Sequence, residues 1–191
     1  AVENGIATIT LNRQATLNAF NDAMIAETID AMKQADRNSN VRCIVLTGAG
    51  RGFSSGQDLS GFQERRGQLS ISEHLRHGYH RLIKLMVRIE KPIIGAINGI
   101  AAGAGAVIAL ACDFRVADER AKLAFLFVKV GLCGADMGAA WLLPQIIGLG
   151  RATELLMLGD SVPAREALAM GLVHRVSAEG QALSDALALA Q

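Results

Sequence analysis

The chain has 191 residues, of which 51% are hydrophobic and 19% are charged, and its formal net charge is +1. This composition excludes a disordered chain, and the length suits one domain with a sizeable core. The near-neutral charge argues against nucleic acid as a partner and against attraction to anionic membranes. Of the three cysteines, Cys43 and Cys112 lie in apolar runs and are expected to be buried thiols, whereas Cys133 does not. An odd number of widely spaced cysteines favours a reducing, cytoplasmic setting.

The N-terminal half alternates strand and helix patterns. Asn4-Gly5 is typical of a tight hairpin turn, so the chain is expected to begin inside a hairpin. The alternation over residues 6–11 predicts a half-buried strand, and Asn21 is expected to cap a helix that runs to about residue 35. The apolar run 41–48 then predicts a buried strand. A Gly- and Ser-rich loop follows it, and residues 70–88 predict a helix with a polar face.

The C-terminal half continues the alternation. Residues 92–99 and 113–118 predict buried strands on either side of the small-residue segment AAGAGAVIALAC, which is expected to turn into a helix. Further on, the sequence predicts a turn at 134–138 and a strand over 171–176. Between them we expect helices from about 139, over 152–158 and over 163–170. Buried strands that alternate with helices indicate an α/β fold. Residues 1–176 form its expected core, and 177–191 the start of a truncated C-terminal helical region.

Twenty consecutive residues without a charge, 93–112, are long enough for a membrane helix. Asn98-Gly99 interrupts this run near its start, and four glycines fall within eleven residues, a poor composition for one continuous helix. Because no aromatic belt flanks the run either, we interpret it as a buried strand, a turn and a buried helix.

The turn Gly99–Gly105, GIAAGAG, places small residues at the first amides of that helix. Such amides have no intrahelical partner and can stabilise an anion, which could be a phosphate or a transient oxyanion. The phosphate motifs fit poorly, since GAGAVI lacks the third glycine of the dinucleotide pattern and GAGRGFSSG lacks Gly-Lys-Ser/Thr. Tight packing of a small-residue helix remains an equal alternative.

Several stretches, taken together and in order, resemble the crotonase superfamily, the enoyl-CoA hydratases and isomerases. The resemblance covers residues 6–176 and lies in GRGFSSGQDL from Gly50, KPIIGAINGIAAGAGAVIALACDFRVAD from Lys91, GADMGAAWLLPQIIGLGRATELLMLGD from Gly134, and the closing AREALAMGLVHRV. It implies a spiral of ββα units that binds an acyl-coenzyme A thioester. Coenzyme A is then part of the substrate, and neither a separate cofactor nor a metal is expected.

The resemblance also implies the site. The main-chain N–H groups of Gln57 and Ala104 match the pair that holds the thioester oxygen as it becomes an enolate, although the family usually has Gly at the position of Ala104. Removing one such donor commonly raises the barrier by about 3–4 kcal/mol. The neighbouring residues expected to bind substrate are Gly56, Asp58, Leu59, Gly103, Gly105, Phe127 and Trp141. Trp141 could instead belong to the core.

The acid–base residues separate the possible reactions. The two glutamates that hydratases of the family use match Val107 and Phe127 here, and neither residue can carry a proton. Asp136 matches an acidic position that several isomerases use to move a proton between carbons of the acyl chain. Its apolar surroundings can raise a carboxyl pKa toward neutrality, while capping of the next helix is the alternative role.

Other candidates carry weaker signals. His74, His77 and His80 share one expected helix, but the third drifts off the face of the first, so metal binding is not expected. Arg13 and Arg51 are candidates for coenzyme A phosphates, with plain surface charge as the alternative.

Three functions follow from these residues. The first is an acyl-CoA isomerase or lyase with Asp136 as proton shuttle, and the second is an enoyl-CoA hydratase whose water-activating acid is not placed. The third is a non-catalytic acyl-CoA binder. The resemblance further implies a homotrimer or hexamer, and no nucleic-acid or membrane partner is expected.

Overall fold

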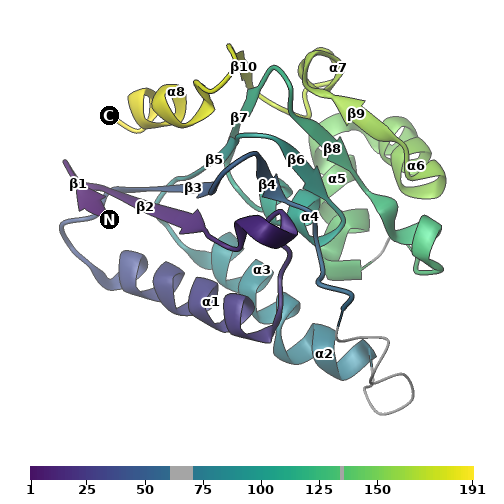
Figure 1. Cartoon of the computed structure of the whole chain (residues 1–191), viewed down its shortest axis with the longest axis horizontal. Coiled ribbons are helices and arrows are strands. Elements are labelled where there is room, and N and C mark those ends of the chain that lie inside the picture. Colours follow the sequence, from purple (N-terminus) through teal and green to yellow (C-terminus); the bar gives the residue numbers. More distant parts are fainter. Residues whose placement is uncertain (61–70, 134–135) are drawn as a thin grey trace.

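The computed structural model describes residues 1–60, 71–133 and 136–191, with the side chains of Ile71 and Asp136 outside the described part (Figure 1). A six-stranded sheet runs through the molecule in the order β1-β2-β3-β5-β7-β10. All neighbours pair in parallel except the hairpin β1–β2. The strands are β1 Val2–Glu3, β2 Ile6–Leu11, β3 Cys43–Gly48, β5 Ile93–Ile97, β7 Phe114–Asp118 and β10 Arg175–Ser177.

Both faces of this sheet are covered, which explains why its central strands read as continuous apolar runs. In β3 the side chains of Ile44 and Leu46 enter the core that α1 (Asp22–Arg37) and α3 (Tyr79–Arg88) share, whereas those of Cys43 and Val45 point to the opposite face. That opposite face packs against α8 (Ala182–Leu189), which lies across it in Figure 1. All six residues of β3 are therefore buried.

A second, four-stranded sheet has the order β4-β6-β8-β9 and consists of three-residue strands. Its strands are β4 Gly52–Ser54, β6 Ile100–Ala102, β8 Lys122–Ala124 and β9 Ser161–Pro163. In the large sheet, β3, β5 and β7 are each followed by a strand of this small sheet and then by helical structure. The parallel pairing β4–β6–β8 therefore repeats one ββα unit along the chain, which confirms the expected fold.

The remaining helices complete these units. They are η1 Gln14–Thr16, α2 Ile71–His77, α4 Ala104–Leu110, η2 Leu126–Val130, η3 Asp136–Gly138, α5 Ala139–Ile147, α6 Leu149–Leu158 and α7 Ala164–Ala169. Asn21 caps α1 as expected, since its Oδ1 accepts from the N–H of Met24 at 2.9 Å. Asn4 and Gly5 both have positive φ, as the predicted hairpin turn requires.

The uncharged run 93–112 is divided among β5, β6 and α4, and every residue of α4 is buried. In the described part of the chain, no helix combines the length and apolar character needed to cross a membrane. The buried strand and the buried helix are confirmed, whereas the segment expected as a turn contains the short strand β6.

Three expectations differ from the structure. The helix expected over 70–88 is two helices within its described part, because Gly78 has non-helical φ and ψ of −104° and −93° between α2 and α3. The last strand lies at 175–177 instead of 171–176. It crosses residue 176, where the sequence predicts a domain boundary, and that boundary stays a prediction. Trp141 is 62% exposed, so its assignment to the core is wrong.

A buried arginine lies at the C-terminal end of α4. The guanidinium of Arg115 donates to the carbonyl oxygens of Cys112 at 2.6 Å, Leu110 at 3.3 Å and Leu172 at 2.7 Å, and the residue is 3% exposed. The cation thereby satisfies carbonyls that the end of a helix leaves without partners.

Replacing Arg115 by Met is expected to lower the free energy of unfolding by at least about 3 kcal/mol, because a hydrogen bond to a charged group contributes about 1.5–3 kcal/mol. Urea denaturation checks this. Arg115→Lys, which keeps the charge but has a single nitrogen, is expected to lie between the Met variant and wild type. An unfolding midpoint of Arg115→Met equal to that of wild type would contradict the assignment.

His174 gives a pH-dependent contribution to stability. Its Nδ1 accepts the N–H of Arg115 at 3.2 Å, and burial together with the Arg115 charge lowers the pKa of the imidazole. The unfolded chain then binds more protons than the folded one just below the ordinary histidine pKa of about 6.5, so stability falls as pH drops through that range.

His174→Asn is therefore expected to flatten the dependence of unfolding free energy on pH between about 7.5 and 5.5, because the amide oxygen accepts without titrating. Urea denaturation at several pH values measures the slope. The effect is modest, because the imidazole is only partly buried and solvent screens its charge. Equal slopes in the two proteins would show that His174 does not contribute.

Candidate active site

The segment 54–58 is fixed by main-chain hydrogen bonds to Phe20. The N–H of Phe20 donates to the carbonyl of Gly56 at 2.7 Å, and the N–H of Asp58 donates to the carbonyl of Phe20 at 2.9 Å. In a planar trans peptide the C=O and the following N–H point in opposite directions. The amide of Gln57 therefore points away from Phe20.

Glycines let this segment lie directly against the turn before α4. A Cβ at Gly56 would lie 2.7 Å from the carbonyl oxygen of Ala102 and 3.3 Å from the nitrogen of Ala104, and Gly56 has a φ of +99°. A Cβ at Gly105 would lie 2.5 Å from the carbonyl oxygen of Ser54. Main chain thus meets main chain between residues 54–57 and 102–105, and both small-residue motifs are required by this close approach.

The amide of Ala104 lies at the start of α4. Gly103, with a φ of +50°, precedes the helix and donates its own N–H to the carbonyl of Ala124 at 2.8 Å. Ala104 is the first helical residue and is 4% exposed. Across the described ranges, neither the Ala104 amide nor the Gln57 amide donates to an acceptor of the protein. Two main-chain donors without a protein acceptor, those of Gln57 and Ala104, therefore lie on segments that meet at Gly56.

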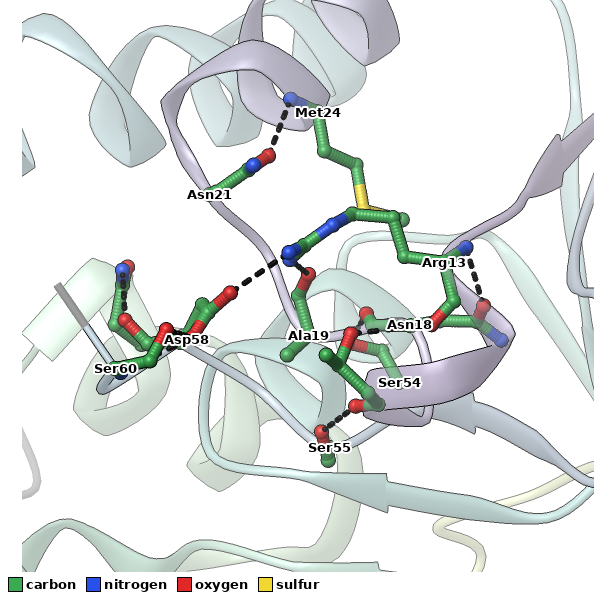
Figure 2. A network of polar contacts seen from close by, with 11 residues as sticks. Arg13, Asn18, Ala19, Asn21, Met24, Ser54, Ser55, Asp58 and Ser60 are labelled. Atoms are coloured by element: carbon green, nitrogen blue, oxygen red, sulfur yellow. Dashed lines mark hydrogen bonds and ion pairs between the residues drawn. The ribbon is translucent and has the colours of Figure 1, made fainter.

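An ion pair ties the residue after Gln57 to the loop that precedes α1 (Figure 2). Nη2 of Arg13 lies 2.9 Å from Oδ2 of Asp58, and Nη1 donates to the carbonyl of Ala19 at 2.6 Å. Hydrogen bonds from Ser60 lower the pKa of the Asp58 carboxyl, and Arg13 adds to this effect. Arg13 is therefore engaged within the protein, which argues against plain surface charge, and its role toward a coenzyme A phosphate stays a prediction.

Asn18 joins the same loop to the motif around Ser54, and the sequence reasoning missed it. Its Nδ2 donates to the carbonyls of Ala49 at 2.9 Å and Gly52 at 2.8 Å, while its own carbonyl accepts from Oγ of Ser54 at 2.8 Å. Figure 2 shows Asn18 beside Ser54 in this network. A fully buried Asn with a φ of +57° indicates a turn that side-chain hydrogen bonds hold in place.

The side chain of Gln57 is also engaged. Its Oε1 accepts from the hydroxyl of Tyr79 at 2.5 Å and lies 3.1 Å from Nε2 of His74, and its Nε2 donates to the carbonyl of Asp58 at 3.1 Å. Burial raises the pKa of Tyr79 far above its ordinary value, so the hydroxyl remains a donor. The sequence did not predict the contact of His74 with Gln57, and Tyr79 was missed.

The other predicted site residues are placed as follows. Val107 and Phe127 are buried in α4 and η2, whereas Leu59 and Trp141 are 56% and 62% exposed. Asp136 begins η3, but its side chain lies outside the described residues, so its orientation stays untested. Arg51 is exposed.

Within the described ranges, no group of His, Cys, Asp and Glu has the arrangement of a metal site. His80 follows Gly78 on α3, so the three histidines do not share one helix. Cys43 and Cys112 are buried as expected, Cys133 is exposed, and all three are free thiols.

Known proteins share this sequence and fold. The model of the enoyl-CoA hydratase/isomerase family matches residues 1–191. The 1,2-epoxyphenylacetyl-CoA isomerase of Escherichia coli is 41% identical over 92% of the chain and 67% of its own length. A putative enoyl-CoA hydratase of Thermus thermophilus is 39% identical over 100% of the chain and 75% of its own length.

Among solved structures, a putative enoyl-CoA hydratase from Streptomyces coelicolor superposes with a TM-score of 0.93 at 44% identity. The alignment covers 100% of this chain and 70% of that protein. With a family model matched over its whole length and relatives of this similarity, the chain belongs to the enoyl-CoA hydratase/isomerase family of enzymes.

Proposed function

We propose that this protein binds an acyl-CoA thioester and stabilises its enolate between the main-chain amides of Gln57 and Ala104. The observation that carries the proposal is the contact of Gly56 with Ala102 and the Ala104 nitrogen, which brings these two unpaired donors together. Family membership supports the substrate class.

The chemistry needs these donors because charge moves onto the thioester oxygen. Removal of a proton from the carbon next to the carbonyl makes an enolate, whose oxygen carries the new negative charge. Two fixed N–H groups stabilise that oxygen more than the neutral carbonyl, and they need no reorganisation during the reaction. Main-chain donors also supply this charge stabilisation without a titratable group.

The proposed reaction is isomerisation, or a related lyase reaction, with Asp136 as the proton shuttle. Val107 and Phe127 are apolar where the resemblance places the hydratase glutamates, so neither can activate water. The name of the Escherichia coli relative, an isomerase that is 41% identical, supports this choice. Hydration stays the alternative because other relatives, such as that of Thermus thermophilus, are named hydratases.

The associated expectations concern partners. Coenzyme A enters as part of the substrate, no separate cofactor is used, and the protein assembles as a homotrimer or hexamer. Gly103, Gly105 and Leu59 line the proposed thioester site, with Asp58 fixing the loop through Arg13.

Ala104→Pro tests the amide pair directly. Proline is well accepted at the first position of a helix, yet it has no N–H. Loss of one donor is expected to lower kcat by about a hundredfold to a thousandfold, the equivalent of about 3–4 kcal/mol. Steady-state kinetics on a panel of unsaturated acyl-CoA thioesters measures this effect, and circular dichroism confirms the fold.

Ala104→Gly is the matched control. It keeps the N–H, supplies the residue usual in the family, and is expected to retain kcat within about threefold. Full activity of a folded Ala104→Pro protein would remove Ala104 from the mechanism.

Asp136→Asn tests the proton shuttle, because the amide has the shape of the carboxyl but cannot take up a proton. The variant is expected to lose isomerisation between 2-enoyl and 3-enoyl thioesters by about a hundredfold or more, the usual contribution of a general acid–base. It is also expected to stop deuterium uptake at the reacting carbons in D2O, which NMR detects. Unchanged exchange, or hydration of crotonyl-CoA by wild type with Asp136 dispensable, would favour the hydratase alternative.

A further inference from the structure

Phe20 holds the main chain around Gln57 through two hydrogen bonds. The side chain of Gln57 is held by other residues, Tyr79 and His74. Gln57 Oε1 receives the hydroxyl of Tyr79 at 2.5 Å and faces His74 Nε2 at 3.1 Å. Nε2 of the Gln57 side chain donates to the carbonyl of Asp58, so Oε1 is the atom that contacts Tyr79 and His74. His74 Nε2 must therefore carry its proton in this arrangement.

The two partners come from the junction of α2 and α3. His74 is in the last turn of α2 and Tyr79 is the first residue of α3, on either side of Gly78. Tyr79 is 2% exposed and meets the ring of Phe20 edge-on at 6.2 Å, and the rings of His74 and Tyr79 are 5.7 Å apart. Tyr79 is thus packed between His74 and Phe20, the residue that holds the main chain of Gln57.

A charge at the start of α1 faces the other side of the imidazole. Nδ1 of His74 lies 3.4 Å from Oδ1 of Asp22, and the side chain of His74 is 13% exposed. The side chains of His74 on α2 and Tyr79 on α3 thus meet the side-chain oxygen of Gln57, and Asp22 on α1 lies against the other side of the imidazole. The hydrogen bonds of Phe20 already hold the main chain of residues 56–58 in place. The additional side-chain network on Gln57 therefore points to a role beyond packing.

We propose that Tyr79 and His74 are positioning residues that act through the Gln57 side chain to aim the Gln57 amide at the thioester oxygen. This inference rests on the proposed function. A hydrogen bond weakens steeply once its angle and length depart from the optimum, and small misplacements in a site can cost large factors in rate. Releasing the side chain lets the 56–57 peptide, which carries the Gln57 N–H, rotate, and the donor loses its aim while remaining present.

The test measures polarisation of the carbonyl, which does not depend on knowing the natural acyl group. Butyryl-CoA or phenylacetyl-CoA, carbon-13 labelled at the thioester carbonyl, is bound to saturation, and isotope-edited infrared spectroscopy records the carbonyl stretch. Wild type is expected to lower this frequency relative to the free thioester. Tyr79→Phe is expected to reduce the shift and to lower kcat by about tenfold to a hundredfold with KM within about threefold.

A double-mutant cycle shows whether Tyr79 acts through Gln57. Gln57→Met keeps the main-chain amide and the chain length but has no acceptor, so it is expected to reproduce the reduced shift. In that background Tyr79→Phe is expected to add nothing, whereas a merely structural role gives additive effects. Thr28→Val is the matched control, because it removes another buried hydroxyl, bonded to the Met24 carbonyl at 2.6 Å, without touching Gln57.

Each outcome decides one claim. If wild type binds neither thioester, or binds without a frequency shift, the proposed function fails. If wild type shows the shift and Gln57→Met and Tyr79→Phe keep it in full, the positioning role is overturned and the proposed function stands. Should Tyr79→Phe not fold, His74→Leu replaces it in the same cycle, with the same expected loss of shift and the same overturning result.

Discussion

The site depends on one contact, the meeting of two main-chain segments with no side chain between them. Residues 54–57 and 102–105 come from successive ββα units, and they touch only because Gly56 and Gly105 lack a Cβ. A second close approach of main chains occurs at the turns before these segments, where Gly99 lies against the carbonyl of Arg51. There, Nδ2 of Asn98 donates to the carbonyl of Gly50 at 2.9 Å. The glycines therefore let the two segments that carry the amides of Gln57 and Ala104 lie in contact, and β4 and β6 pair in parallel just before those segments.

The surrounding structure makes this contact rigid. Helix α4 is buried along its whole length, and the guanidinium of Arg115 satisfies carbonyls at its C-terminal end. On the other segment, Asn18 and the Arg13–Asp58 pair tie the loop to residues before α1. Both segments that carry the proposed donors are thus held by helix packing, hydrogen bonds and an ion pair within the protein. Preorganised donors of this kind are the basis of electrostatic catalysis.

Much of the fold could be predicted from the sequence, because its signals are local. The hairpin at Asn4-Gly5, the Asn21 cap and the buried strands follow from turn chemistry and apolar periodicity. The short strands β4, β6, β8 and β9 were missed because three residues show no period. The break at Gly78 was missed because a single glycine is tolerated inside many helices. Exposure of Trp141 depends on what packs around α5, which no local pattern contains.

The site divides in the same way. Gly103 and Gly105 could be found from the small-residue turn before α4, whereas Gly56 followed from the family resemblance, and the close approach of main chains at Gly56 and Gly105 became visible only in the structure. The partners of the Gln57 side chain could not, because Tyr79 and His74 lie about 20 positions along the chain and meet it only after α2 and α3 fold back.

Because the two proposed oxyanion donors are main-chain N–H groups, they impose almost no constraint on side-chain chemistry. Substitutions at positions such as Val107 and Phe127 can change which atom of a substrate gains or loses a proton while the anion receptor stays intact. An architecture of this kind separates the conserved task of holding charge from the variable task of moving protons. It offers a physical route by which one scaffold diversifies into many reactions, each reachable through few replacements.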